Sequence, residues 1–182
     1  MRKIYEIIKQ FQGDKECLNI YVSKTTEALQ IKERIGSDAT QFTGLLNQII
    51  AQIKELLGRE IVQNYVKLCS IFGEADSISR LLLCEIFELK LKPYLHHALD
   101  TDNISPNRFL EYLALSYTLL HDLAKNFTNQ LAELKLDIQS LIEHLLKNIF
   151  GPFLSNYFSL ELSTLRAAID GSIKYITEPL AV

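Results

Sequence analysis

The sequence is poor in the residues that interrupt helices or build turns. Its 182 residues include seven glycines and four prolines, and tryptophan is absent. A fold of many short strands needs frequent turns rich in glycine and proline, so a β-sandwich or β-barrel is disfavoured. Leucine, isoleucine, lysine, glutamate and glutamine are abundant instead, and this composition favours helix.

The chain also lacks a long apolar run and a block of charge of one sign. No segment approaches the ~20 apolar residues that a membrane-spanning helix needs, because even ISRLLLCEIFELKL is interrupted by Arg80, Glu85 and Glu88. The N-terminal MRKIYEIIKQFQGD lacks the apolar core of a signal peptide. With a net charge of −3, a broad nucleic-acid surface is disfavoured. We therefore expect a cytoplasmic protein that binds no nucleic acid.

Catalytic and metal-binding patterns are absent as well. GxSxG, Walker-type and GxGxxG motifs do not occur, and adjacent histidines on a helix point about 100° apart, so they do not share a face. We expect no catalytic, cofactor-binding or metal-binding residue, no cofactor and no enzymatic activity. The residues weighed and set aside for such roles are His96, His97, His121, His144, Ser116, Ser155 and Ser163.

Three further groups have a structural and a functional interpretation. The cysteines, Cys17, Cys69 and Cys84, are far apart and best interpreted as buried thiols in a reducing compartment. Lys90 and Lys92 in KLKPYLHH predict either a solvated helix face or a small basic face for acidic partners or lipid. The aromatic residues at helical spacing are core residues or, as the alternative, line a ligand pocket: Tyr112, Tyr117, Phe127, Tyr157 and Phe158.

Apolar periodicity predicts a series of helices along the whole chain. The clearest stripe runs from Phe42 to Phe72 and predicts one helix of about 34 residues at 38–72, capped by Ser37-Asp38, with a bend or break at Gly58. Gly73 ends it. The other predicted helices span 2–12 (inward Ile4, Ile7, Ile8 and Phe11), 14 to Gly36 (Leu18, Tyr21, Val22, Thr25, Ala28 and Leu29), 77–99, 106 to about 133, and 137 to about 170.

Prolines and caps refine three of these helices. The 77–99 helix, capped by Asp76 or Ser77, is apolar nearly all round, which predicts a central position and a kink at Pro93. After the loop DTDNISP, Ser105 and Pro106 read as N-cap and first residue. Phe109, Tyr112, Leu113, Leu120, Phe127, Leu131 and Leu134 are expected inward. In the last region, Asp137 is the expected cap, Gly151-Pro152 the expected break or kink, and the tail TEPLAV is expected to fray.

The chain repeats one apolar pattern. Residues 77–99 and 140–162 align with identities at Ser77/Ser140, Leu82/Leu145, Leu83/Leu146, Ile86/Ile149, Phe87/Phe150, Leu91/Leu154, Tyr94/Tyr157 and Leu99/Leu162. Each copy follows a long amphipathic helix, although Leu-rich helices also align by chance. We predict an all-α, elongated helical-bundle rod of stacked long helices. It divides into an N-terminal helical segment, 1–73, and two repeated units within 74–182, at about 74–136 and 137–182.

Several motifs together resemble the Sec-ten subunit family of the exocyst vesicle-tethering complex. They are IxRLLLxxIFELKLKPYL, FLEYLALSYTLLHDLAKNF, LIEHLLKNIFGPFLSNYF and the opening MRKIYEIIKQFQGDKECLNIYVSK, in which Phe11, Gly13, Cys17 and Tyr21 match. The resemblance covers nearly all of the chain, and family members are several times longer. A divergent recyclin-type trafficking protein is the alternative relative.

The resemblance implies a function without catalysis. The chain would be a segment of the helical rod of a subunit that tethers secretory vesicles to the plasma membrane through protein–protein contacts. Its implied partners are other exocyst subunits, with small GTPases of vesicle traffic as further candidates and only indirect membrane contact. The implied location is cytoplasmic and peripheral at sites of exocytosis. If the native chain continues into further helices, exposed apolar patches are expected at one or both ends. The alternative function is a small all-helical ligand-binding or regulatory domain with an internal apolar pocket.

Overall fold

The protein is helical throughout the part that the computed structural model describes, which comprises residues 1–10, 13–29, 31, 38–73, 75–100, 104–134 and 136–177. Every regular element in these ranges is a helix, so the predicted all-α fold is confirmed. The elements are α1 (Arg2–Gln10), α2 (Asp14–Thr26), α3 (Ala39–Leu57), η1 (Gly58–Gln63), α4 (Tyr65–Phe72), α5 (Ala75–Cys84), η2 (Glu85–Leu91), α6 (Lys92–Ala98), α7 (Pro106–Glu133) and α8 (Gln139–Thr177).

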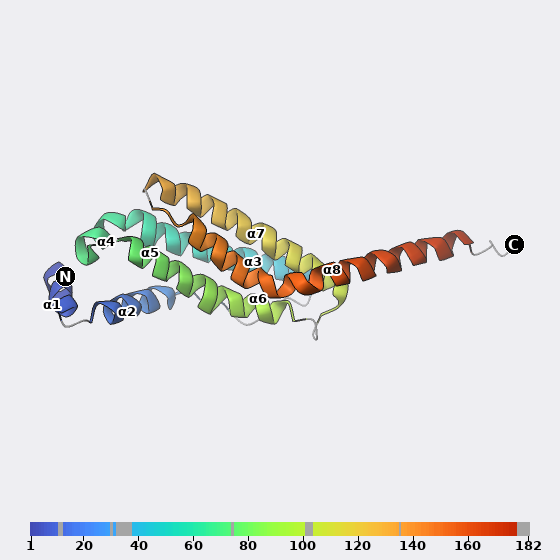
Figure 1. Ribbon diagram of the computed structural model, residues 1–182, viewed down its shortest axis with the longest axis horizontal. Coiled ribbons are helices and arrows are strands. Elements are labelled where there is room, and N and C mark those ends of the chain that lie inside the picture. Colours follow the sequence, from blue (N-terminus) through green and yellow to red (C-terminus); the bar gives the residue numbers. More distant parts are fainter. Residues whose placement is uncertain are drawn as a thin grey trace.

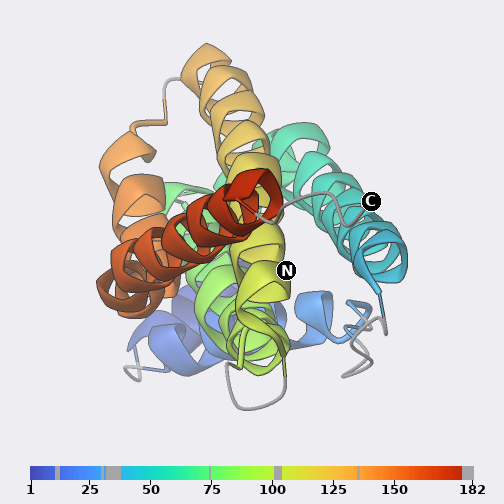
Figure 2. The same ribbon diagram turned by 90° about the vertical axis from the view of Figure 1, so that its right-hand side faces the viewer.

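The helices form an elongated bundle with α1 at one end and α8 extending past the other (Figure 1). Helix α7 packs against both α3 and α8, and α8 packs against the continuous segment α5–η2–α6. Helix α2 lies against α5 and η2, and α1 contacts α2 and α4. Seen along the long axis, the second half of α8 stands in front of the bundle (Figure 2). The α5–η2–α6 segment therefore has neighbours on several sides, as its nearly all-round apolar sequence predicted.

Local chemistry sets where several helices begin and end. The Asp38 carboxylate accepts a hydrogen bond from the Gln41 amide at 2.9 Å, which caps α3. Ser105 and Pro106 are the N-cap and first residue of α7, as predicted. Gly73 ends α4 with φ 83°, a left-handed conformation that favours glycine. The predicted roles of Phe11, Gly36 and Ser37 lie outside the described residues, as do residues 101–103 of the loop before α7 and residues 178–182.

Two predicted boundaries differ from the structure by a few residues. Helix α5 begins at Ala75, so Asp76 lies in its first turn and pairs with Arg80 at 2.9 Å instead of capping a helix at Ser77. The second predicted helix was expected to take Asp14 as its N-cap, whereas Gly13 is the N-cap of α2 and Asp14 is its first residue. Such shifts are small on the scale at which helix ends are defined.

Gly58 does not break the helix that follows Asp38. Its backbone is helical, with φ −60° and ψ −43°, and the chain continues into the π-helical turn η1. The interruption lies at Asn64, where φ −91° and ψ 4° separate η1 from α4. The helix that was predicted to run from residue 38 to residue 72 is thus divided at Asn64, six residues after Gly58, where a bend or break was expected.

Pro93 is accommodated by a π-helical stretch. η2 (Glu85–Leu91) comes immediately before α6, in which Pro93 occupies the first turn. Proline lacks an amide hydrogen and its ring crowds the preceding turn, and the wider π-helical turn is a recognised local adjustment of a helix. Where a kink at Pro93 was predicted, the structure therefore shows a change of helix type.

The expected break at Gly151-Pro152 was wrong, because α8 runs without interruption from Gln139 to Thr177. Its axis changes direction in Figure 1 where the colour passes from orange to red, which fits the alternative of a kink. The helix therefore also extends beyond the predicted end at Asp170-Gly171. An interior proline costs a helix one hydrogen bond, and the remaining turns on both sides maintain it.

The six residues at the centre of the repeat, which we expect to be structural core, are buried. Leu82, Ile86 and Phe87 of the first copy and Leu145, Ile149 and Phe150 of the second are each at most 3 % exposed. Other predictions of inward positions were wrong: Ile4 and Ile7 of α1 and Ala28 are exposed. Thr26 is buried instead, and its hydroxyl is satisfied there by a hydrogen bond shared between the carbonyls of Val22 and Ser23.

The core is shared across the predicted domain boundary at residues 73 and 74. Apolar residues of α3, such as Leu46, belong to the same buried cluster as those of α7 and α8. The division into 1–73 and two units in 74–182 remains a prediction about how the rod is organised.

Candidate interaction surface

The four histidines do not converge on one site. The His96 ring meets Phe153 edge-on, with centroids 4.9 Å apart, and the His121 ring stacks near Tyr117. His144 lies 3.2 Å from the Asn148 side-chain amide. Over the part of the chain that the structure describes, no group of three histidine, cysteine, aspartate or glutamate residues could hold a metal ion.

The cysteines and serines also show no shared chemistry. Each of the three cysteines is a partly buried free thiol. Burial, with a smaller effect of Glu88, raises the pKa of the Cys84 thiol, which disfavours the nucleophilic thiolate. The hydroxyls of Ser155 and Ser163 donate to carbonyls of their own helix, those of Pro152 and Leu160. Serine side chains within helices commonly donate to a carbonyl of the preceding turn in this way, so these hydrogen bonds give no sign of a catalytic role.

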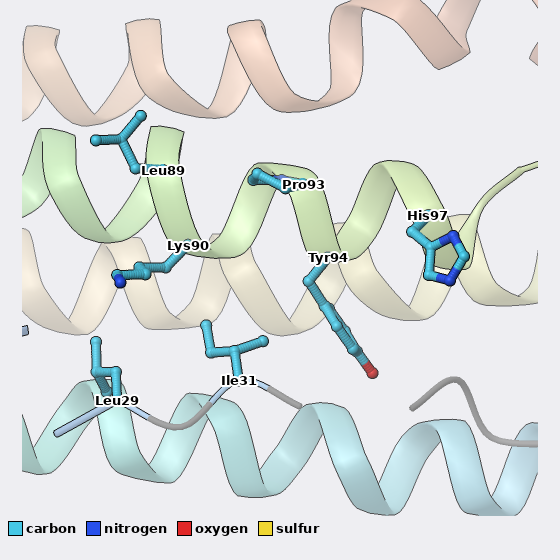
Figure 3. Close-up of a pocket in the computed structure, with 7 residues that line it drawn as sticks. All are labelled: Leu29, Ile31, Leu89, Lys90, Pro93, Tyr94 and His97. Atoms are coloured by element: carbon cyan, nitrogen blue, oxygen red, sulfur yellow. The ribbon is translucent and has the colours of Figure 1, made fainter. Parts of the chain in front are cut away.

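Lys90 and Lys92 do not form the single basic face that their spacing suggested. Lys92 pairs with Glu88 at 3.1 Å, and the other Glu88 oxygen accepts from Asn148 of α8 at 2.9 Å. Lys90 points to a pocket of about 350 Å³ that is also lined by Leu29, Ile31, Leu89, Pro93, Tyr94 and His97. Figure 3 shows Lys90 and His97 on either side of Tyr94.

The predicted aromatic positions divide between the core and the surface. Tyr112 and Phe127 are buried, whereas Tyr117 is half-exposed and Phe158 is 67 % exposed. Tyr117 lines a mainly apolar groove of about 280 Å³ between α7 and α8, together with Leu113, Ala114, Thr118, Phe150, Leu154 and Tyr157. The groove is at the surface, so it differs from the internal pocket of the alternative prediction.

Helix α8 changes character on the face that points away from the bundle. Ile142, Leu145 and Ile149 are buried against the other helices. The opposite face of this half is polar and exposed: Ser140, His144, Lys147 and Gly151. Along the same line after Pro152, at helical steps of four, four, three and four, come Leu154, Phe158, Leu162, Leu165 and Ile169.

We call these five residues the α8 stripe. Each is between 50 and 67 % exposed, and the helix that carries them extends past the rest of the bundle in Figure 1. Between Gly151 and Ile173 the helix has three charged residues, Glu161, Arg166 and Asp170. A continuous apolar line on an exposed helix marks an interaction surface. The stripe is the candidate functional site of this chain.

Exposed apolar residues also occur near the other end. Ile4 and Ile7 of α1 and Ile20 of α2 are each more than half exposed. The expectation of exposed apolar patches toward the ends is therefore confirmed, with the larger one on α8.

Sequence reasoning missed the α8 stripe because it treated the second copy of the repeat as core along its whole length. The two copies are equivalent only as far as Phe87 and Phe150. Beyond them, Leu91 and Leu99 are buried, whereas Leu154 and Leu162 are half-exposed. The signal that could have revealed the stripe is the small number of charges after Pro152 combined with apolar residues on one line.

Within the described ranges, no helix combines the length and the apolar character needed to cross a membrane.

A family model and the similar curated proteins identify the same family. The family model described as "Exocyst complex component Sec10-like, alpha-helical bundle" matches residues 1–177. The human protein "Exocyst complex component 5" is 25 % identical over 169 residues, which cover 92 % of this chain and 21 % of the human protein. The rat and mouse proteins of that name are each 22 % identical with the same coverage. The chain therefore spans about a fifth of the length of these relatives, and no solved structure matches it.

Proposed function

Because the chain belongs to the family of Sec10-like exocyst components that form an α-helical bundle, we propose that it is a rod segment of an exocyst subunit that tethers secretory vesicles to the plasma membrane. The segment acts by protein contact and catalyses no reaction. Its buried helices fix the shape of the bundle, and its exposed faces meet other exocyst subunits.

The family membership over residues 1–177 is the observation that carries this proposal. The physical character of the molecule supports it. The large buried side chains form one apolar cluster, and the most distinctive surface feature is the α8 stripe on a projecting helix. Such a surface fits association with other helices, because apolar stripes at helical spacing are how helices recognise one another.

The proposed location follows from the same role. A tethering subunit works in the cytoplasm, peripherally at sites of exocytosis, and its contact with membrane is indirect. Small GTPases of vesicle traffic are proposed as further partners of the assembled complex.

The proposal is tested by affinity purification of the tagged full-length protein from cells that express it. Exocyst subunits are expected to co-purify, and depletion is expected to leave secretory vesicles accumulated near the plasma membrane. Re-expression of the protein with Leu46→Asp, which places a charge at a fully buried core position, should fail to rescue, whereas Val66→Asp at a position 77 % exposed should rescue. The absence of exocyst subunits from the purified material, together with normal vesicle numbers after depletion, would refute the proposal.

A further inference from the structure

The α8 stripe has the spacing of a two-helix coiled-coil seam. Phe158, Leu162, Leu165 and Ile169 follow at steps of four, three and four, which are the d, a, d and a positions of successive heptads. In this register Glu161 is a g residue and Arg166 is the e residue that follows it. A second helix with the same apolar pattern covers a seam of this kind. Helix α8 of another copy of the chain has this pattern, because its sequence is identical.

The charges beside the seam select an orientation. In a parallel pair, a g residue of one helix lies next to the e residue five positions later in the other, so Glu161 of each copy would meet Arg166 of its partner. In an antiparallel pair, g meets g and e meets e, which places like charges together. Neither Glu161 nor Arg166 takes part in an ion pair within the described part of the chain. The Glu161 carboxylate accepts a hydrogen bond from the Tyr157 hydroxyl of its own helix, and its second oxygen is left to meet Arg166 of the partner in the parallel arrangement.

The bundle leaves room for that arrangement. The residues that anchor α8 to the other helices, such as Ile142, Leu145 and Ile149, lie on the face opposite the line that the stripe continues. In two copies joined along the stripe, the two helical bundles would therefore lie on opposite sides of the helix pair, away from each other. The polar face that precedes the stripe, which includes His144 and Lys147, limits the contact to the part of α8 after Pro152.

Covering the stripe would leave few polar groups without partners. Ser155 and Ser172 continue the seam line on either side of the stripe, and their hydroxyls already donate to carbonyls of α8 at 3.2 and 2.9 Å. Burial of a polar group costs free energy mainly when its hydrogen bond to water is not replaced. These serines keep their bonds, and their small side chains let a second backbone approach closely.

From the seam, its flanking charges and the open side of α8, we propose that a second copy of this chain binds the α8 stripe and forms a parallel helix pair. The pair has Phe158, Leu162, Leu165 and Ile169 at its centre and two symmetric contacts between Glu161 and Arg166. This inference does not rest on the exocyst assignment. Since the seam is only two heptads long, the dimer is weak and forms in a concentration-dependent equilibrium.

Sedimentation equilibrium of the 182-residue chain, over a series from about 1 to several hundred micromolar, measures the association. The parent chain is expected to shift from monomer to dimer across this range. Leu165→Asp should weaken the dimer at least tenfold, since it places a charge in the seam. Val66→Asp, which changes an exposed residue of α4, should leave it unchanged. Thermal unfolding of each variant verifies that the fold is intact.

The charged pair gives a second, non-disruptive test. Glu161→Arg and Arg166→Glu should each weaken self-association several-fold, because each creates like-charge contacts in the parallel pair. An equimolar mixture of the two variants should dimerise at least as tightly as the parent. Orientation is measured with Leu165→Cys, which should oxidise to a linked dimer much faster than the parent or Val66→Cys, because only a parallel, in-register pair brings position 165 next to itself.

Three results would overturn the proposal. The first is a parent chain that stays monomeric throughout the series. The second is a dimer that tolerates Leu165→Asp, which would place the contact on another surface. The third is a monomeric chain whose Leu165→Asp variant loses a co-purifying exocyst subunit, which would assign the stripe to that subunit. Normal co-purification with exocyst subunits together with loss of self-association in Glu161→Arg would keep both proposals and separate their surfaces.

Discussion

The rings of Phe42 and Tyr112 lie face to face, with centroids 4.0 Å apart and planes 11° from parallel. Phe42 belongs to α3 and Tyr112 to α7, and both side chains are at most 1 % exposed. Their contact joins the N-terminal part of the chain to the helix that packs against α8. The first prediction concerns this junction.

Replacing Phe42 with alanine should lower the free energy of unfolding by about 3–5 kcal/mol, because it leaves a cavity next to Tyr112 in a fully buried place. Urea denaturation measures the change. Val66→Ala, at an exposed position, serves as the control and should alter stability by no more than about 0.5 kcal/mol. Equal effects of the two variants would contradict the assignment of α3 to the core.

The two copies of the repeat should respond differently at their aligned leucines. Leu91→Ala removes a side chain that is 0 % exposed and should cost about 2–5 kcal/mol. Leu154→Ala truncates a side chain that is 50 % exposed and should cost less than about 1 kcal/mol in the monomer. Melting curves recorded at low protein concentration test this difference. If Leu154→Ala lowered the free energy of unfolding as much as Leu91→Ala does, position 154 would be buried in the monomer.

The cap at Asp38 should contribute measurably to α3. Asp38→Ala removes the acceptor of the Gln41 amide and should destabilise the protein by about 1 kcal/mol. Ser105 is an N-cap whose side chain makes no capping hydrogen bond, so Ser105→Ala is the matched control, with a change of a few tenths of a kcal/mol. Chemical denaturation of both variants side by side tests the difference.

Glu88 should make stability depend on pH. The hydrogen bond from Asn148 and the nearby Lys92 ammonium outweigh partial burial and hold the pKa of the Glu88 carboxyl below its usual value of 4.5. A lowered folded-state pKa stabilises the protein above the unfolded-state pKa, and this contribution is lost as pH falls through the folded-state value. The melting temperature of the parent should therefore exceed that of Glu88→Gln at pH 7, and the difference should shrink toward pH 3.

Glu133→Gln is the control for that titration, since Glu133 lies exposed at the end of α7. It should follow the parent across the pH range. A constant difference between the parent and Glu88→Gln from pH 7 to pH 3 would mean that the Glu88 contacts do not depend on its charge.

Pro152→Ala should stabilise α8. Within a helix, proline removes one backbone hydrogen bond and crowds the preceding turn, so alanine at this position should raise the free energy of unfolding by about 2 kcal/mol. Pro106 occupies the first residue of α7, where proline is favoured, and Pro106→Ala should be neutral or slightly destabilising. Differential scanning calorimetry distinguishes the two, and a loss of stability in Pro152→Ala would indicate that the bend itself is needed for packing.

The sequence predicted the helices well because their signals are local. Apolar residues at helical spacing identified the faces of α3 and α7, and Asp38, Gly73 and Pro106 marked ends through chemistry that needs no distant partner. Boundaries at glycines and prolines were less accurate. Whether Gly58, Pro93 or Pro152 interrupts a helix depends on the packing of neighbouring turns, and a single sequence does not contain this information directly.

Burial after Phe150 was the main point at which the sequence was insufficient. Leu91 and Leu154 have similar surroundings in the sequence, yet Leu91 is 0 % exposed, whereas Leu154, at the groove between α7 and α8, is 50 % exposed. The difference arises because α8 extends past the end of the bundle, which depends on the lengths of α3, α6 and α7 together. The candidate surface was therefore expected in outline, as an apolar patch near one end, and its residues emerged only from the structure.

The uninterrupted course of α8 has a mechanical consequence. Its 39 residues span roughly 60 Å at 1.5 Å per residue, and the same backbone serves as a bundle helix at one end and a projecting shaft at the other. A force applied to the projecting end of α8 is transmitted through its backbone hydrogen bonds to the interface between α7 and α8, where it acts parallel to the helices. Many buried side chains of that interface must then move together, so the bundle resists the force cooperatively. Pro152 is the position at which α8 bends first, because one backbone hydrogen bond is missing there.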